Sequence, residues 1–286
     1  MLTREQVDRF RRDGVLVVED AVDPGLLARM RADFAAWVDE SRGQSNAYGT
    51  TINGLARFHI ESDHDAQRPK LLRVNAPVEV SDAYLEAMRD SRMTDSVAQL
   101  IGPDLKFHHS KINSKQPGGG TEVKWHQDFA FTPHSNDDVV TALLMIDDVT
   151  EDNGPLEVLP GSHRGPIQSI WHEGLFTGAI DEQEAARCRR DAVLCTGRAG
   201  SVCLMHTRLL HGSAANRSPR PRTLFICVYS ADDAVPLSPN PMPSRFEGEL
   251  LRGRRSGRVR SVPFELELPQ LPRTGSFFDQ QAAPTG

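Results

Sequence analysis

The 286-residue sequence has few cysteines and no long apolar run. A chain of this length does not need disulfide bonds to hold a core, so we expect free thiols and a reducing, cytoplasmic location. The cysteines contain no C-x-x-C pair: Cys188, Cys195, Cys203 and Cys227. No apolar stretch approaches the roughly 18 residues that cross a bilayer, and the charged start resembles no signal peptide, so no membrane partner is expected. A net charge of only −6 argues against nucleic-acid binding.

Residues 1–103 have the spacing of helices that support a core. Three segments are expected to be helical, each starting near a capping residue or a proline: Thr3 to Gly14, Asp23-Pro24 to about Ser41, and residues 82–100. A short apolar strand is expected over Val15–Val18. Residues 42–66 are polar, contain glycine and show no periodicity, so they are predicted to form a long loop.

After residue 104 the pattern changes to short β-rich segments separated by turns. The expected strands are Lys106–Asn113, Val139–Ile146, Leu156–Leu159, Ser201–Met205 and Thr223–Ser230. Many short strands with Gly/Pro turns are typical of a sandwich or barrel, so the predicted fold class is mainly β with flanking α-helices. One domain is favoured over two for a chain of this size.

The predicted domain covers residues 1–286 and has three parts. Residues 1–103 form a mainly helical support, and residues 104–230 form the β core. Residues 165–192 interrupt that core with an expected helix at Asp181–Arg190, and they are long enough to act as a lid. Residues 231–286 form a C-terminal extension whose end, 282–286, is expected to fray.

The most informative motif is Trp125-His126-Gln127-Asp128. Residues two apart in a strand face the same side, so His126 and Asp128 can point together into a barrel. His211, which follows an expected strand, can supply a third ligand. Two histidines and one carboxylate leave three open positions on an octahedral metal, which suits iron(II) and oxygen chemistry. A zinc hydrolase could use similar ligands but keeps one open position.

An H-x-D pair alone is a weak signal, and an arginine further along the chain strengthens it. Arg222 precedes the apolar strand Thr223-Leu224-Phe225-Ile226, where a buried guanidinium would need an anionic partner. Its planar fork can bind a carboxylate with two hydrogen bonds. A co-substrate with a chelating end and a distal carboxylate, such as 2-oxoglutarate, would satisfy both the metal and the arginine. Arg220 has the same strand parity and is the alternative.

Three blocks of sequence resemble the phytanoyl-CoA dioxygenase family, which includes ectoine hydroxylases and bacterial natural-product oxygenases. The blocks are residues 125–128, 153–164 and 200–222. The resemblance implies a double-stranded β-helix (jelly-roll, cupin-like) core, iron(II) held by His126, Asp128 and His211, and the co-substrates 2-oxoglutarate and O2. Five residues are assigned to the co-substrate region: Arg222, Ser213, Asn113, His109 and Gln127. His109 stands where ectoine hydroxylases have a glutamine, and strand alternation places it opposite in direction to His108.

The resemblance implies hydroxylation of an unactivated C–H bond in a small molecule, an amino acid or a secondary metabolite, with release of succinate and CO2. Family halogenases replace the carboxylate ligand by a small residue, so Asp128 favours hydroxylation. Phe129-Ala130-Phe131 departs from the acidic, tryptophan-containing continuation of ectoine hydroxylases, which disfavours ectoine as the substrate.

Several alternatives stay open at the level of sequence. The same residues could serve desaturation, cyclisation or epoxidation, a cupin-like enzyme without 2-oxoglutarate, or a non-catalytic metal sensor. The protein is expected to be a monomer or homodimer. Arg57 and Arg73 could bind an acidic substrate, and residues 43–66 could form a second lid. The basic run 252–260 is either a phosphate or CoA site or, as we favour, a solvated loop.

Overall fold

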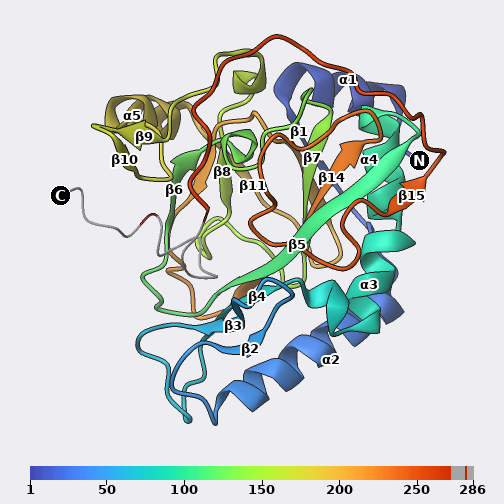
Figure 1. Cartoon of the computed structure of the whole chain (residues 1–286). Helices are drawn as coiled ribbons and strands as arrows, with labels where there is room; N and C mark the ends of the chain where they lie inside the picture. Colours follow the sequence, from blue (N-terminus) through green and yellow to red (C-terminus); the bar gives the residue numbers. More distant parts are fainter. Residues whose placement is uncertain (272–280, 282–286) are drawn as a thin grey trace.

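The computed structural model describes residues 1–271 and Gln281, so the expected fraying of residues 282–286 lies outside the described residues. Helices α1–α4 lie along one side of the molecule, and α5 lies at the other side (Figure 1). The helices are α1 (Arg4–Asp13), α2 (Pro24–Ser41), α3 (Asp82–Arg89), α4 (Arg92–Ile101) and α5 (Glu182–Asp191). Three short 3-10 helices are η1 (Pro77–Glu79), η2 (Asp128–Ala130) and η3 (Ser162–Arg164).

The larger of two facing sheets has a separate hydrophobic core on each of its sides. Its hydrogen-bonded order is β1-β12-β7-β14-β5-β4-β3-β2, with β15 also paired to β5. The strands are β1 (Val15–Val18), β2 (Tyr48–Thr50), β3 (Ala56–Ile60), β4 (Leu71–Asn75), β5 (Leu105–Lys115), β7 (Val139–Met145), β12 (Val202–His206), β14 (Arg222–Ala231) and β15 (Leu250–Arg252).

The smaller sheet closes the barrel and carries two of the expected metal ligands. Its order is β11-β8-β13-β6, and a separate hairpin pairs β10 with β9. The strands are β6 (Val123–His126), β8 (Leu156–Val158), β9 (Trp171–His172), β10 (Leu175–Phe176), β11 (Val193–Cys195) and β13 (His211–Ser213). Two antiparallel sheets packed face to face confirm the predicted jelly-roll core.

The side chains of strand β7 pack alternately into two different hydrophobic cores. Val140, Ala142 and Leu144 pack toward the helical side, in a core shared with α2, α3 and α4. Leu143 and Met145 point the other way, into a second core between the two sheets. Alternation along the strand therefore separates the helical layer from the barrel interior, and the site lies on the interior side.

Most expected elements form, but two predictions were wrong. Residues 42–66 are not one loop, because they contain β2 and β3, which extend the larger sheet. Residues 82–100 form two helices instead of one. The chain leaves helical geometry at Asp90, with φ −126° and ψ 42°, and α4 starts after Ser91. The four cysteines are buried free thiols, as expected.

The C-terminal extension runs over the surface from β15 toward α5 (Figure 1). Arginines of the basic run pair with acidic residues of the same chain. Arg252 lies 2.8 Å from Asp95, and Arg260 lies 3.0 Å from Asp233. Further along, the backbone oxygen of Leu268 accepts a hydrogen bond from Trp171. These ion pairs favour the reading of the run as a surface segment over a phosphate site. In the described part of the chain, no helix is long and apolar enough to cross a bilayer.

Candidate active site

Three side chains converge inside the barrel with the geometry of a metal site. The Nε2 atom of His126 lies 3.4 Å from Asp128 Oδ1, and the Nε2 atom of His211 lies 3.6 Å from the same oxygen. The ligand atoms of all three residues lie within 4.8 Å of one another. Among the described residues this is the group of three metal-ligating side chains that could hold an ion. Two imidazole nitrogens and one carboxylate are the donor set of a non-haem iron(II) site.

The backbone explains why these three residues meet. His126 ends β6 and is paired directly with His211 of β13, so both imidazoles leave the smaller sheet on one face. Asp128 was predicted to lie in a strand, but it begins η2. Gln127 between them keeps extended geometry, with φ −120° and ψ 127°, so the two-residue alternation still holds. The predicted pairing of His126 with Asp128 is therefore correct, although Asp128 lies in a 3-10 helix and not in a strand.

Hydrogen bonds fix each ligand in the form that a metal needs. The Nδ1 atom of His126 lies 2.8 Å from the backbone oxygen of Lys124, and that of His211 lies 2.9 Å from the oxygen of Leu209. Both Nε2 atoms are thereby left to face the centre of the site. Burial lowers the pKa of His126 to about 4, which keeps the imidazole neutral and able to coordinate.

The carboxylate ligand is oriented in the same way. Asp128 Oδ2 accepts a hydrogen bond of 2.7 Å from Thr141 Oγ1 on β7, which leaves Oδ1 toward the histidines. Burial opposes ionisation of Asp128, but the neighbouring His211 and His126 hold its pKa well below the usual range. The residues present thus fit an iron(II) ion, which His126, Asp128 and His211 would hold.

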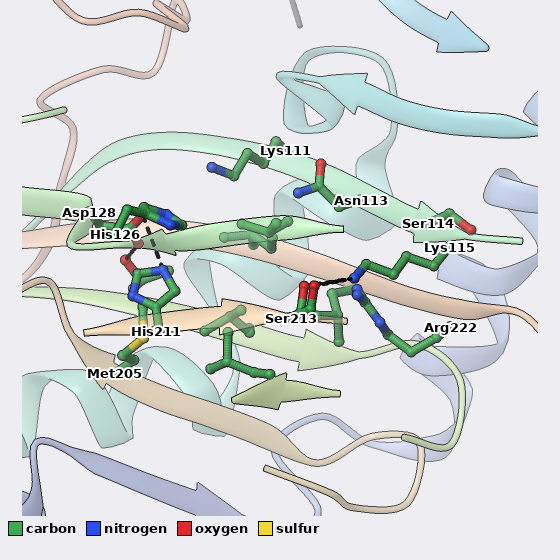
Figure 2. A pocket seen from close by; sticks show the side chains of 16 residues that line it. Lys111, Asn113, Ser114, Lys115, His126, Asp128, Met205, His211, Ser213 and Arg222 are labelled. Atoms are coloured by element: carbon green, nitrogen blue, oxygen red, sulfur yellow. Dashed lines mark hydrogen bonds and ion pairs between the residues drawn. The ribbon is translucent and has the colours of Figure 1, made fainter. Parts of the chain in front are cut away.

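A cavity extends from the three ligands along the barrel interior to a cationic end (Figure 2). Its side walls are apolar, and polar side chains gather at the two ends and along β5. The apolar lining consists of Val123, Leu143, Leu156, Met205, Leu224 and Ile226. The polar lining consists of Lys111, Asn113, Ser114, Lys115, Thr141, Ser213 and Arg222, with the three ligands.

Arg222 and Ser213, which the resemblance assigns to the co-substrate, both line the far end of this cavity. Arg222 is 3% exposed, and its Nε donates to the backbone oxygen of Gly154 at 3.0 Å. Burial lowers the pKa of Arg222 to about 10, so the guanidinium stays charged near neutral pH. Arg220, the alternative, is exposed on the surface, which excludes it as a cavity residue. Strand parity alone could not separate the two arginines, but burial does.

Lys115 joins Arg222 and Ser213, and sequence reasoning missed it. Its Nζ donates to Ser213 Oγ at 2.7 Å and to the Ser213 backbone oxygen at 3.2 Å. Burial and the nearby Arg222 lower the pKa of Lys115 to about 6. The expected strand stopped at Asn113, whereas β5 runs on to Lys115. The signal was present, because Lys115 shares the parity of Asn113.

Asn113 lines the cavity beside Lys111, as expected for a residue near the co-substrate. Its Oδ1 atom is buried and accepts no hydrogen bond from the described residues, so it can accept one from a ligand. His109 is buried near Asp128 and Lys111 but is not among the residues that line the cavity.

Two expectations about neighbouring side chains need correction. His108 was expected to point away from His109, but β5 has a bulge here, and the two Nδ1 atoms lie 2.6 Å apart. Gln127 was assigned to the co-substrate, but its amide binds the backbone of Arg208 at 2.6 Å and of Gln168 at 2.8 Å. Gln127 therefore anchors the 165–192 insertion.

The two arginines proposed to bind an acidic substrate differ in the structure. Arg57 pairs with Glu79 at 2.8 Å and donates to the backbone oxygens of Asn75 and Ala76, so its donors stabilise the fold. Arg73 is 2% exposed, and its charge acts on both Lys111 and His109. Of these two arginines, Arg73 is therefore the one that is coupled to residues beside the candidate site.

Comparison with known proteins assigns the family. Residues 10–224 match the family model of phytanoyl-CoA dioxygenase (PhyH). A probable alpha-ketoglutarate-dependent hypophosphite dioxygenase of Stutzerimonas stutzeri is 34% identical over 218 residues, which cover 74% of this chain and 75% of the relative. An L-proline trans-4-hydroxylase of Streptomyces griseoviridis is 30% identical over 251 residues, covering 81% and 87%.

A solved structure shares the fold. The crystal structure of EctD from S. alaskensis with bound Fe has a TM-score of 0.66 at 23% identity, covering 93% of this chain and 88% of that chain. The family match and the His-Asp-His site together establish the class. The chain belongs to the phytanoyl-CoA dioxygenase family and is a 2-oxoglutarate-dependent non-haem iron dioxygenase.

Proposed function

We propose that this dioxygenase hydroxylates an unactivated C–H bond of a small molecule and converts 2-oxoglutarate to succinate and CO2. The observation that carries the proposal is one continuous cavity with the three ligands at one end and Arg222, Lys115 and Ser213 at the other. A dicarboxylate with a chelating keto acid fits both ends of such a cavity. Bound iron(II) with 2-oxoglutarate supplies the activation of O2.

The residues of the chain supply binding and orientation. Arg222 and Ser213 would bind the distal carboxylate of 2-oxoglutarate, and Lys115 would add a second cation. The apolar walls, including Leu143 and Leu224, exclude water from the middle of the cavity. Thr141 holds the Asp128 carboxylate, so the ligand set keeps one geometry while the co-substrate and substrate enter.

The 165–192 insertion is proposed to act as a lid over the metal. Phe176 of β10 packs edge-on against Phe131 at 5.9 Å, and Phe131 packs against the ligand His126 at 5.5 Å. These aromatic contacts connect the insertion directly to the site. An aromatic wall next to the metal suits a compact organic substrate better than a large polymer.

The names of the relatives support a small-molecule substrate. They include proteins named for hypophosphite, ectoine and L-proline, which are all compact. Ectoine stays disfavoured for this chain, because Phe131 stands beside the ligand His126 where the ectoine hydroxylases have a different continuation. We propose an amino acid or secondary metabolite as the substrate class.

The test is a screen of metabolites with the full chain, Fe(II), 2-oxoglutarate and O2. Hydroxylation predicts equimolar succinate and a product that gains one oxygen atom. A product that loses two hydrogens instead would assign a desaturase or cyclase. Oxygen consumption without conversion of any metabolite would favour the sensor, and succinate formation independent of added metabolite would contradict coupling to a substrate. Sedimentation of the same sample would test the expected monomer or homodimer.

A further inference from the structure

A band of polar side chains crosses three neighbouring strands beside the metal ligands. The strand register pairs His59 with Arg73, Arg73 with Asn113, and Asn75 with Lys111. Directly opposed residues of antiparallel strands point to the same face of the sheet. One polar strip on this face of the sheet therefore contains His59, Arg73, Asn75, Lys111 and Asn113. Asn113 lines the cavity, so the strip lies on the side of the sheet that faces the cavity.

The opposite face of the same strands shows that this arrangement is specific. Phe58, Val74 and Ile112 alternate with the strip residues and pack into the core under the helices. The strip therefore occupies positions on the barrel side of the sheet, where an ordinary barrel core would have apolar residues. Polar side chains in such positions indicate ligand contact.

The guanidinium of Arg73 is held in a fixed orientation. Its Nε donates to Asn75 Oδ1 at 2.7 Å, and its Nη2 lies 2.9 Å from the sulfur of Met242. The amide nitrogen of Asn75 lies 3.2 Å from the Nε2 atom of His59. A guanidinium held by such contacts loses little side-chain entropy when it binds a ligand.

Two cations of the strip act on each other and on the metal site. Burial and the positive charge of Arg73 lower the pKa of Lys111 to about 8, and Asp128 acts in the opposite direction. A divalent metal held by Asp128 would balance the charge of that carboxylate. The charges of Arg73 and Lys111 would then be left for an anionic group to balance.

We propose that the polar strip binds a compact oxyanion of the substrate, a carboxylate or phosphonate group, through Arg73 and Lys111. The proposal rests on the proposed function and names its substrate class as small and anionic. The anion would anchor the molecule so that its C–H bond lies beside the metal.

The position of Arg73 separates this anion site from the co-substrate site. Arg222, Lys115 and Ser213 lie at the far end of the cavity, and we propose them for the distal carboxylate of 2-oxoglutarate. Arg73 is not among the residues that line that cavity, whereas Lys111 is. Figure 2 shows the Lys111 amine pointing toward the Asp128 end. Lys111 thus lines the cavity and is close enough to Arg73 to be affected by its charge.

The experiment is anaerobic calorimetry on the full chain loaded with Fe(II) and 2-oxoglutarate. The probes are acetate, methylphosphonate and hypophosphite, with acetamide as a neutral analogue of acetate. At least one anion should bind the wild type, and acetamide should not. Arg73→Gln should weaken that binding by about 30-fold, the loss expected for a charge-assisted hydrogen-bond pair. Arg73→Lys, which keeps the charge but loses the planar fork, should recover part of the affinity.

The controls separate anion binding from folding and from the proposed function. Arg68→Gln removes a 75% exposed arginine shortly before β4 and should leave anion affinity within twofold. If Arg73→Gln does not fold, Lys111→Met in the same assay should still weaken binding at least tenfold. The proposal is overturned if no anion binds the wild type, or if both variants bind like the wild type. Anion binding without any oxygenated product would leave this site intact and contradict only the proposed hydroxylation.

Discussion

Replacing Lys115 by methionine should stabilise the protein without co-substrate and weaken its binding of 2-oxoglutarate. Lys115 is charged in the unfolded chain, where its pKa is near 10.5, whereas burial and Arg222 lower its pKa to about 6 in the fold. At a pH of about 7.5 the Lys115 amine must therefore lose its proton when the chain folds. That pH is about three units below 10.5, so the loss costs about 4 kcal/mol of folding free energy. Methionine occupies a similar volume and carries no charge.

The lost hydrogen bonds oppose this gain. Near pH 7.5 the neutral amine of Lys115 has two N–H groups to share among three acceptors, Ser213 Oγ, the Ser213 oxygen and the Ala214 oxygen, and each hydrogen bond contributes about 1 kcal/mol. The net gain is then about 2 kcal/mol, or a rise in Tm of about 4–8 °C. Because the folded pKa is depressed, wild-type stability should rise as pH increases from about 6 toward 10.5, and Lys115→Met should remove that slope.

Co-substrate binding gives the second readout. A bound carboxylate should draw a proton onto Lys115, so 2-oxoglutarate binding above pH 6 should take up a proton and weaken as pH rises. Lys115→Met should abolish the uptake and lower the affinity by about 10–100-fold. Calorimetry in two buffers of different protonation enthalpy measures both quantities, and thermal unfolding measures the stability.

A matched control lies on the same strand. Lys106 also donates to two backbone oxygens, those of Asp232 and Ala234, but it lies outside the cavity. Lys106→Met should leave the affinity for 2-oxoglutarate unchanged. A Lys115→Met protein that unfolds more readily than the wild type and binds 2-oxoglutarate equally well would refute the reasoning.

Two further substitutions test the supports of the site. Thr141→Val removes the hydrogen bond to Asp128 and should weaken metal binding by about 10–100-fold, measured by anaerobic Fe(II) titration; unchanged affinity would show that Asp128 needs no such support. Gly154 has φ +78°, and a Cβ there would lie 2.6 Å from the Ala214 oxygen. Gly154→Ala should cost about 1–3 kcal/mol in unfolding experiments and raise the KM for 2-oxoglutarate, because Arg222 binds the Gly154 oxygen; a normal KM would contradict that link.

The sequence predicted the chemistry of the site better than the elements that carry it. His126 and Asp128 were identified from a strand parity that holds only because Gln127 is extended, although Asp128 itself lies in a 3-10 helix. Arg222 and Arg220 have equal parity, and only the buried position of Arg222 in the fold decides between them. Sequence spacing therefore narrows the set of candidate site residues, and burial in the folded chain identifies which candidate lines the cavity.

The missed strands have a physical explanation. β3 reads Ala56-Arg57-Phe58-His59-Ile60, and both Arg57 and His59 are buried. Arg57 is buried because Glu79 pairs with it from η1, a contact that no local pattern reveals. Apolar and polar residues do alternate along β3, but the pattern covers only five residues within a polar stretch, so it is a weak signal for a strand.

The most direct test of the central account is conversion of 2-oxoglutarate to succinate by the full chain with Fe(II), in the wild type and in Asp128→Ala. The account predicts succinate formation by the wild type and its loss in Asp128→Ala, because the carboxylate ligand is missing. Asp39→Ala, which removes an 82% exposed carboxylate, should behave like the wild type. Full succinate formation by Asp128→Ala would contradict the assignment of His126, Asp128 and His211 as the metal site.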